Sequence, residues 1–218
     1  SGIPRERAEL KVCDDGCVEL VVGTMSSGQG HETSFPQVVS DWLQIPFEKV
    51  RFVANDTDRV TVGGGSHSGR SMRLVSIAVG EAIKDLIAKG KGVAAHELQA
   101  PEADMVYEDG VFSAPGGGEI GLWETAKAAV TLEGVGDITN RAGGYPYGSH
   151  VCEVEVDPET GHVDIVAWTA VDDIGLAINP LILHGQAHGA VTQGIGQAML
   201  EAIHYDPNSA QLLSGSFM

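Results

Sequence analysis

The stretch that decides the fold of this chain is Gly23-Thr24-Met25-Ser26-Ser27-Gly28-Gln29-Gly30-His31-Glu32-Thr33. Upstream, alternating apolar residues around the turn Asp14-Asp15-Gly16 predict a β-hairpin over residues 10–22. Downstream, apolar residues at i, i+3, i+4, i+7 and i+8 predict a helix over about residues 34–44, with Thr33 or Ser34 as its cap. The stretch is therefore a glycine-rich turn that leads from a strand into the start of a helix.

The start of this helix is a favourable place for an anion or a polar heterocycle. The first backbone N–H groups of a helix have no partner inside it, and the helix dipole adds positive potential at that end. Gly28 and Gly30 would let the backbone approach a bound group closely. A plain glycine turn before a capped helix is the alternative that spacing alone leaves open.

A second glycine-rich segment, Gly63-Gly64-Gly65-Ser66-His67-Ser68-Gly69-Arg70-Ser71, also leads into a helix. Its hydroxyls, the Arg70 side chain and its unpaired backbone amides suit the oxygens of a phosphate group. It matches neither a Walker sequence nor a GxGxxG dinucleotide fingerprint. The two segments together predict one phosphorylated ligand between two helix starts.

Composition limits the classes of partner. The 218 residues are 43% apolar and 20% charged, which fits a compact globular domain and excludes disordered and fibrous chains. Acidic residues outnumber basic ones 30 to 13, and the net charge of -17 argues against nucleic acid and anionic membranes as partners. No apolar run approaches the roughly 18 residues of a membrane span. An anionic ligand would need local binding by backbone groups.

The three cysteines suit a reducing, cytoplasmic compartment, because they are too few for a disulfide framework. Cys13 and Cys17 flank the first turn and are expected to face each other across the hairpin. The pair His184 and His188, at i and i+4, lacks the Glu of a zinc-protease motif, so packed or solvated histidines are the favoured interpretation. A second group that could hold a divalent metal consists of His31, Glu32, Asp56 and Asp58. The favoured interpretation is that these residues belong to a helix start and a polar loop.

The fold class predicted is α+β, with antiparallel hairpins layered against helices. Two subdomains are expected, residues 1–149 and 150–218, with a cofactor at the seam. The remaining expected elements are a strand over residues 50–54, a helix from Leu74 to Gly90, a hairpin over 105–113, a helix over 121–131, a glycine-rich connector over 132–149, a hairpin over 152–168 and a helix from Asn179-Pro180.

At this point the residues resemble a known family, the molybdenum hydroxylases, which include xanthine dehydrogenase, aldehyde oxidoreductase and aerobic carbon monoxide dehydrogenase. The resemblance begins with Gly23 to Thr33 and covers essentially the whole chain in order. It continues through Gln44-Ile45-Pro46, Asp56-Thr57-Asp58, Gly69-Arg70-Ser71, Asn179-Pro180, Gly185-Gln186 and Gln193-Gly194-Ile195-Gly196.

The resemblance implies that the chain is a fragment of the large subunit, holding much of its second molybdopterin-binding domain. The cofactor-binding residues implied are Gly28, Gln29, Gly30 and His31 in the glutamine turn, Gly69, Arg70, Ser71 and Met72 in the phosphate loop, and Gln186 and Gln193 as amide contacts. Gly69 departs from the family, where relatives often have Ser, so one hydroxyl contact is lost and the amide is kept.

The implied reaction is oxidation of a small molecule, an aldehyde, a purine or other N-heterocycle, or CO, with water as the source of oxygen. Molybdopterin with molybdenum is the implied cofactor, its cytosine dinucleotide form being left open, while FAD and iron–sulfur clusters belong to other subunits or domains. The family's base glutamate is expected beyond the equivalent of Met218, so the fragment alone is expected to be inactive and Asp137 is interpreted as a connector residue. A non-catalytic cofactor-binding or assembly module is the alternative.

Overall fold

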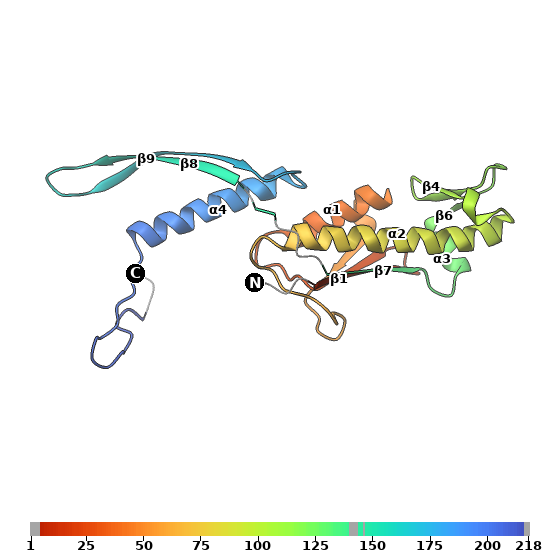
Figure 1. Ribbon diagram of the computed structural model, residues 1–218, viewed down its shortest axis with the longest axis horizontal. Coiled ribbons are helices and arrows are strands. Elements are labelled where there is room, and N and C mark those ends of the chain that lie inside the picture. Colours follow the sequence, from red (N-terminus) through yellow and green to blue (C-terminus); the bar gives the residue numbers. More distant parts are fainter. Residues whose placement is uncertain (1–4, 140–143, 146, 216–218) are drawn as a thin grey trace. The chain divides into compact units, whose positions relative to one another are not determined.

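The computed structural model of the chain describes residues 5–139, 144–145 and 147–215. By packing, the chain separates into two compact units, one up to Ile178 and one from Asn179 onward. The proposed subdomain boundary near residue 150 stays a prediction. The fold is α+β, as predicted, with small sheets packed against helices (Figure 1).

The central sheet has the strand order β3-β2-β1-β7. Strand β1 (Arg5–Val12) pairs antiparallel with β2 (Val18–Val22), which confirms the opening hairpin, and β2 pairs parallel with β3 (Val50–Val53). The hairpin closes with the Cys13 backbone N–H donating to the Cys17 carbonyl at 2.8 Å, so the two cysteines do lie opposite each other, and both are free thiols.

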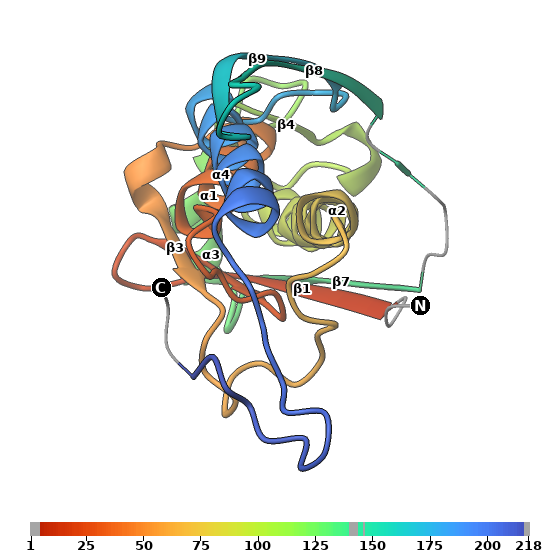
Figure 2. The same cartoon turned by 90° about the vertical axis from the view of Figure 1, so that its left-hand side faces the viewer.

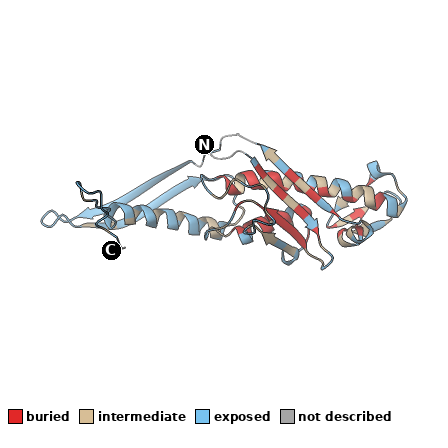
Figure 3. Cartoon of the chain, turned by 90° about the horizontal axis from the view of Figure 1, so that it is seen from below, coloured by how far each residue is buried: buried red, intermediate tan, exposed pale blue. Residues whose placement is uncertain are grey.

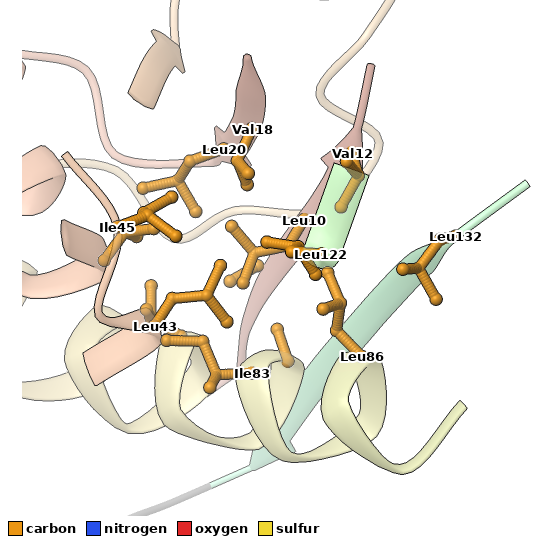
Figure 4. Close-up of a cluster of buried hydrophobic side chains, with 14 of the residues drawn as sticks. Leu10, Val12, Val18, Leu20, Leu43, Ile45, Ile83, Leu86, Leu122 and Leu132 are labelled. Carbon is orange, nitrogen blue, oxygen red and sulfur yellow. The ribbon is translucent and has the colours of Figure 1, made fainter. Parts of the chain in front are cut away.

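Helices α1 (His31–Leu43) and α2 (Ser71–Leu98) pack on this sheet. Figure 2 looks along α2 and shows β1 and β7 running beneath it. Every second residue of β1, from Glu6 to Val12, is buried. Apolar side chains from the sheet meet those of the helices in one core, which Figure 4 shows in part and which includes Leu10, Val12, Val18, Leu20, Leu43, Ile83 and Leu86.

The predicted connector over residues 132–149 is wrong at its start, because Glu133–Thr139 form strand β7. This strand pairs antiparallel with β1 along its whole length. A Cβ on Gly134 would lie 2.1 Å from the Ala82 carbonyl oxygen, and one on Gly136 would lie 1.9 Å from that of Ala78. The glycines thus let α2 lie directly on the strand. Residues 140–143 and 146 of the connector lie outside the described residues.

Asp137 is consequently a sheet residue and not a connector residue. It lies on β7 opposite Arg7, and it accepts two hydrogen bonds from the Arg5 guanidinium, at 2.8 Å from Nε and 2.6 Å from Nη2. These bonds hold the pKa of the Asp137 carboxyl at about 2. Asp137 is therefore bound within the sheet as an anion.

Both long helices have bounds that differ from prediction. Helix α1 begins three residues early, and its N-cap is Gly30, in the left-handed region at φ 72°, with no side-chain cap. Helix α2 continues past Gly90 to Leu98. A Cβ on Gly90 would lie 2.3 Å from Cζ of Phe112, so this glycine makes room for a ring and does not end the helix.

A small second sheet, β4-β5-β6, lies beyond α2 in the chain. The predicted hairpin is confirmed as β4 (Val106–Glu108) and β5 (Val111–Ser113), and β6 (Glu119–Gly121) adds a third strand. Helix α3 is shorter than predicted, Leu122–Ala128. One 3₁₀ turn, Glu102–Asp104, precedes β4, and another, Phe47–Lys49, lies earlier in the chain between α1 and β3.

The third predicted hairpin is confirmed and is longer than expected, with β8 (Tyr147–Val156) pairing antiparallel with β9 (Val163–Asp173). Helix α4 (Pro180–Met199) begins where predicted, and the Asn179 side chain caps it by accepting from the Ile182 N–H at 3.1 Å. In Figure 3, β8 has the colour of exposed residues throughout and α4 has it over most of its length. Within the described residues, no helix is long and apolar enough to cross a membrane.

Candidate functional site

The two glycine-rich segments predicted to bind one ligand lie against each other. We call residues 23–30 the glutamine loop and residues 63–70 the serine loop. A Cβ on Gly23 would lie 2.2 Å from the Cα of Gly63, and the Gly65 N–H donates to the Gly23 carbonyl at 3.3 Å. Such an approach excludes any side chain at Gly23 or Gly63. The structure therefore brings the starts of α1 and α2 together, as the sequence predicted.

Hydroxyl groups link the two helix starts. The Ser71 hydroxyl, on the first residue of α2, lies 2.8 Å from the hydroxyl of Thr24 and 3.0 Å from that of Ser66. Thr24 is completely buried, and its carbonyl accepts from Nδ1 of His31 at 3.3 Å. The two loops thus form one hydrogen-bonded unit, and neither can move without breaking these bonds.

Gln29 is held in the middle of the glutamine loop by both ends of its side-chain amide. Its Oε1 accepts from the Ser27 N–H at 2.6 Å, and its Nε2 donates to the Ser66 hydroxyl at 2.5 Å. An amide nitrogen carries two donor hydrogens, so Ser66 takes one of them. The flanking Gly28 and Gly30 have φ of 107° and 72°, which L-residues rarely adopt. The sequence here builds a curled loop that presents an oriented amide.

His31 is an internal hydrogen-bonding group and not a surface cation. Its side chain is buried, and its ring lies against that of Phe35 with centroids 5.1 Å apart. Burial lowers the pKa of the imidazole, which favours the neutral form. Because Nδ1 donates to the Thr24 carbonyl, Nε2 is the acceptor nitrogen of that neutral ring.

The side chain of Arg70 turns into the protein, although the sequence suggested that it would contact a phosphate. It is enclosed, with 3% of its side chain exposed, and Nη1 forms an ion pair with the fully buried Glu6. Nη1 also donates to the Gly65 carbonyl at 2.8 Å, and the Arg70 N–H donates to the His67 carbonyl at 3.1 Å. A buried carboxylate requires a charged partner, which explains why the guanidinium turns inward.

The other predicted residues of the serine loop differ in exposure. Gly69 is exposed at φ 63°, and a Cβ there would meet no atom within 4 Å. Ser71 is buried and hydrogen bonded, as described above. The Met72 side chain is half-buried, and its sulfur accepts from the Ser76 hydroxyl at 3.2 Å. Space for a ligand on this loop therefore lies at Gly69.

Gln186 and Gln193 belong to the second compact unit. They are exposed on α4, seven residues apart, so they lie two turns apart on the same helix face. A Cβ on Gly185 or Gly189 would meet open space, so these glycines make no close contact within the described residues. The same face of α4 is thus accessible along two turns.

His31, Asp56 and Asp58, weighed above as part of a metal site, lie at the start of α1 and in the loop after β3. Among the described residues, no group of three or more His, Cys, Asp or Glu side chains is arranged to hold a metal ion. Asp56 accepts from the Asp58 N–H at 2.9 Å, within the polar loop expected at this position.

Sequence reasoning missed Glu6 and Thr24, and it included Ser66 only among the hydroxyls of the second glycine-rich segment. The signal for Glu6 was present, because it falls on the same face of β1 as Ala8, Leu10 and Val12. A carboxylate in line with an apolar stripe is buried only with a partner. Thr24 and Ser66 carry no comparable signal, since their contacts depend on how the two loops meet.

A sequence model of the family described as "Molybdopterin cofactor-binding domain" matches residues 1–218. The chain belongs to this family. It is similar to the carbon monoxide dehydrogenase large chain of Afipia carboxidovorans, with 32% identity over 224 residues, and to the nicotine 6-hydroxylase large subunit of Paenarthrobacter nicotinovorans, with 33% identity over 227 residues. Each alignment covers 98% of this chain and 28% of the relative.

Solved structures agree with this membership. A Cu,Mo-CO dehydrogenase matches with a TM-score of 0.86 and 31% identity, over 97% of this chain and 28% of the other. Quinoline 2-oxidoreductase from Pseudomonas putida 86 matches with a TM-score of 0.82 and 30% identity. The chain therefore has the fold of a molybdopterin cofactor-binding domain and spans just over a quarter of these larger proteins.

The groups at the two loops suit a molybdopterin. A pterin offers paired donors and acceptors, which an oriented amide such as that of Gln29 matches without adding charge. A phosphate accepts from hydroxyls and from backbone N–H groups at a helix start. Gly28 and Gly69 leave open space where a Cβ would project, so the backbone can approach such a group. The donor set and the space both fit the cofactor of this family.

Proposed function

We propose that the glutamine loop and the serine loop hold the pterin and phosphate end of a molybdopterin cofactor within a molybdenum hydroxylase large subunit. The observation that carries the proposal is the meeting of two glycine-rich loops and two helix starts in a chain of this family. The proposed contacts come from Gly28, Gln29, Gly30 and His31 on one loop, Gly69, Ser71 and Met72 at the other, and Gln186 and Gln193 on α4.

The net charge of the chain shapes how it would bind phosphate. At -17 the protein repels anions at long range, so attraction must come from groups in direct contact. Arg70 is occupied by Glu6, which leaves hydroxyls, backbone N–H groups and the dipole of α2. We expect Arg70 to act on the phosphate region through the loop and not as a ligand.

The activity proposed for the complete subunit is the oxidation of a small molecule with water as the oxygen source. The cofactor supplies the redox chemistry when bound, while the residues of this chain bind and orient it. The substrate class proposed is an aldehyde, a purine or other N-heterocycle, or CO. The names of relatives, which give carbon monoxide, nicotine and quinoline, support CO and N-heterocycles. The base glutamate is proposed to lie in the larger chain, and FAD and iron–sulfur clusters in other domains or subunits.

The rest of the large subunit is the proposed partner of the β8–β9 hairpin. One face of this hairpin carries apolar cross-strand pairs, Cys152 with Trp168, Val154 with Ile165, and Val156 with Val163. We call it the apolar hairpin face. A two-stranded hairpin is only marginally stable in water unless something covers it. The remaining length of the relatives supplies a candidate cover, and the free thiols support a cytoplasmic location.

The test is the molybdenum and pterin content of the complete parent subunit, produced in a host that makes molybdopterin. The expected result is near-stoichiometric molybdenum together with a pterin. Any nucleotide released from that pterin shows whether the cofactor has the cytosine dinucleotide form. A complete and folded subunit with neither would contradict the proposal. That outcome would favour the alternative function, a non-catalytic binding or assembly module.

A further inference from the structure

A buried ion pair lies beneath the serine loop. Glu6, on β1, is fully buried, and the Arg70 side chain is 3% exposed. The two residues are 64 positions apart in the chain and meet through Nη1 and Oε1. Few charges are buried in this way, because removing them from water costs several kcal/mol each. Among the described residues, no other ion pair has both side chains this deeply buried.

The pair holds the backbone of the serine loop at two points and ties it to β1 at a third. Glu6 Oε1 accepts from the Gly64 N–H at 2.9 Å, while Arg70 donates to the Gly65 carbonyl at 2.8 Å and, through Nη2, to the Arg5 carbonyl at 3.4 Å. The guanidinium occupies the space beside Gly64, where a Cβ would lie 2.3 Å from Nη2. Glu6 therefore fixes Gly64 and Arg70 fixes Gly65, two residues that have no side chains of their own to hold them.

Ser66, which follows these glycines, carries the effect to the glutamine loop. Its hydroxyl accepts from Gln29 Nε2 at 2.5 Å and lies 3.0 Å from that of Ser71. A shift of Gly64 or Gly65 would move Ser66 and release the Gln29 amide. The path from Glu6 to Gln29 thus consists of direct contacts and adjacent residues.

We propose that Glu6 and Arg70 are positioning residues for the cofactor: they hold the serine loop and, through Ser66, the Gln29 amide in the geometry that binds it. This inference rests on the proposed function. The second carboxylate oxygen of Glu6, Oε2, is buried without a hydrogen-bond partner among the described residues. An arrangement built only for stability would satisfy or omit that oxygen, since apolar replacements of buried ion pairs are often as stable.

The test uses the complete subunit, isolated with its cofactor, in three forms: the natural sequence, Glu6→Gln, and the double variant Glu6→Leu/Arg70→Met. The double variant leaves no uncompensated buried charge, so its melting temperature should stay close to that of the natural sequence. We expect its molybdenum and pterin content to fall about tenfold, a typical effect of losing a residue that orients a ligand-binding group. Amide hydrogen exchange should speed up in residues 63–70 but not in the middle of α2.

Glu6→Gln keeps an acceptor for the Gly64 N–H, so its cofactor content should lie between those of the other two forms. If the pair served the fold alone, cofactor content would instead follow melting temperature across the three forms. Arg51→Met is the control, because it removes the ion pairs of a half-exposed arginine on β3 with Asp15 and Glu19 and should leave cofactor content unchanged.

The inference would be overturned if the double variant kept both its cofactor content and its rate of amide hydrogen exchange in residues 63–70. If that variant does not fold, the same result for Glu6→Gln would overturn it. A natural sequence that is folded but empty would instead overturn the proposed function. In that case hydrogen exchange in residues 63–70 still decides whether the pair positions the loop.

Discussion

Gln29 shows how two loops can fix the orientation of a single side-chain amide. Replacing it with alanine removes the bond to Ser66 and the acceptor for the Ser27 N–H. Loss of these half-buried bonds should lower stability by only about 1 kcal/mol. In the complete subunit, Gln29→Ala should lower molybdenum content or turnover about tenfold. Thr33→Ala, an exposed change in the first turn of α1, is the control, and equal values for the two variants would sink the assignment of Gln29.

His31 should make the stability of the domain depend on pH. Its pKa in the folded protein lies below the ordinary value of 6.5, because the ring is buried. Above that value both states are neutral and the residue has no effect on the pH dependence. As the pH falls below it, the unfolded chain binds a proton that the folded chain does not, so stability is lost.

This pH dependence can be measured by urea unfolding of the complete subunit between about pH 7.5 and pH 5. The natural sequence should lose more stability over that range than His31→Asn, which has no titrating ring at this position. Parallel losses in the two proteins would show that His31 does not control the effect.

At the scale of elements, glycines on β7 decide how closely α2 packs. Gly136 lies under the backbone of α2, and a Cβ would meet the Ala78 carbonyl at 1.9 Å. Gly136→Ala should therefore separate strand and helix and lower the free energy of unfolding by about 2 kcal/mol or more. Gly116→Ala, where a Cβ would meet open space, should change it little. Similar urea midpoints for both variants would mean that the strand shifts to accept the methyl group.

The same glycines explain which elements the sequence could predict. The first and third hairpins and the Asn179 cap follow from local patterns of apolar and turn residues, and the start of α1 does so to within three residues. Strand β7 does not, because Gly134 and Gly136 stand where a period-two pattern would show large apolar side chains. For the same reason Gly90 indicates a helix end in the sequence although it accommodates Phe112 in the fold. Glycines that serve long-range packing look like turns when only neighbours are considered.

The candidate site was predictable to the extent that it is local. The glutamine loop and the serine loop were identified from their glycines and helix starts, and the structure places them together. The direction of the Arg70 side chain was not predictable, because it depends on Glu6, which is distant in sequence and joins it only through the packing of β1 under the loop. One indication of this pairing was present in the sequence, because Glu6 is an acidic residue within the apolar face of β1.

For the molecule as a whole, the described hairpin β8–β9 has more apolar surface than a two-stranded element can keep in water. Val154 is 48% exposed and Val156 53%, yet both belong to the apolar hairpin face, whereas Glu155 and its partner Asp164 lie on the opposite face. If the rest of the large subunit covers the apolar hairpin face, a charge placed there becomes buried without a partner. Val154→Asp should then destabilise the complete subunit by about 3 kcal/mol.

Glu155→Gln is the matched control for this prediction, since it changes charge on the opposite face of the same strand. Its melting temperature should stay close to that of the natural sequence, because surface substitutions rarely exceed about 0.5 kcal/mol. Equal melting temperatures for Val154→Asp and Glu155→Gln would mean that the apolar hairpin face remains in water in the complete subunit. The hairpin would then need a separate protein as its cover, and association with that protein, not the folding of one chain, would determine when the apolar hairpin face is buried.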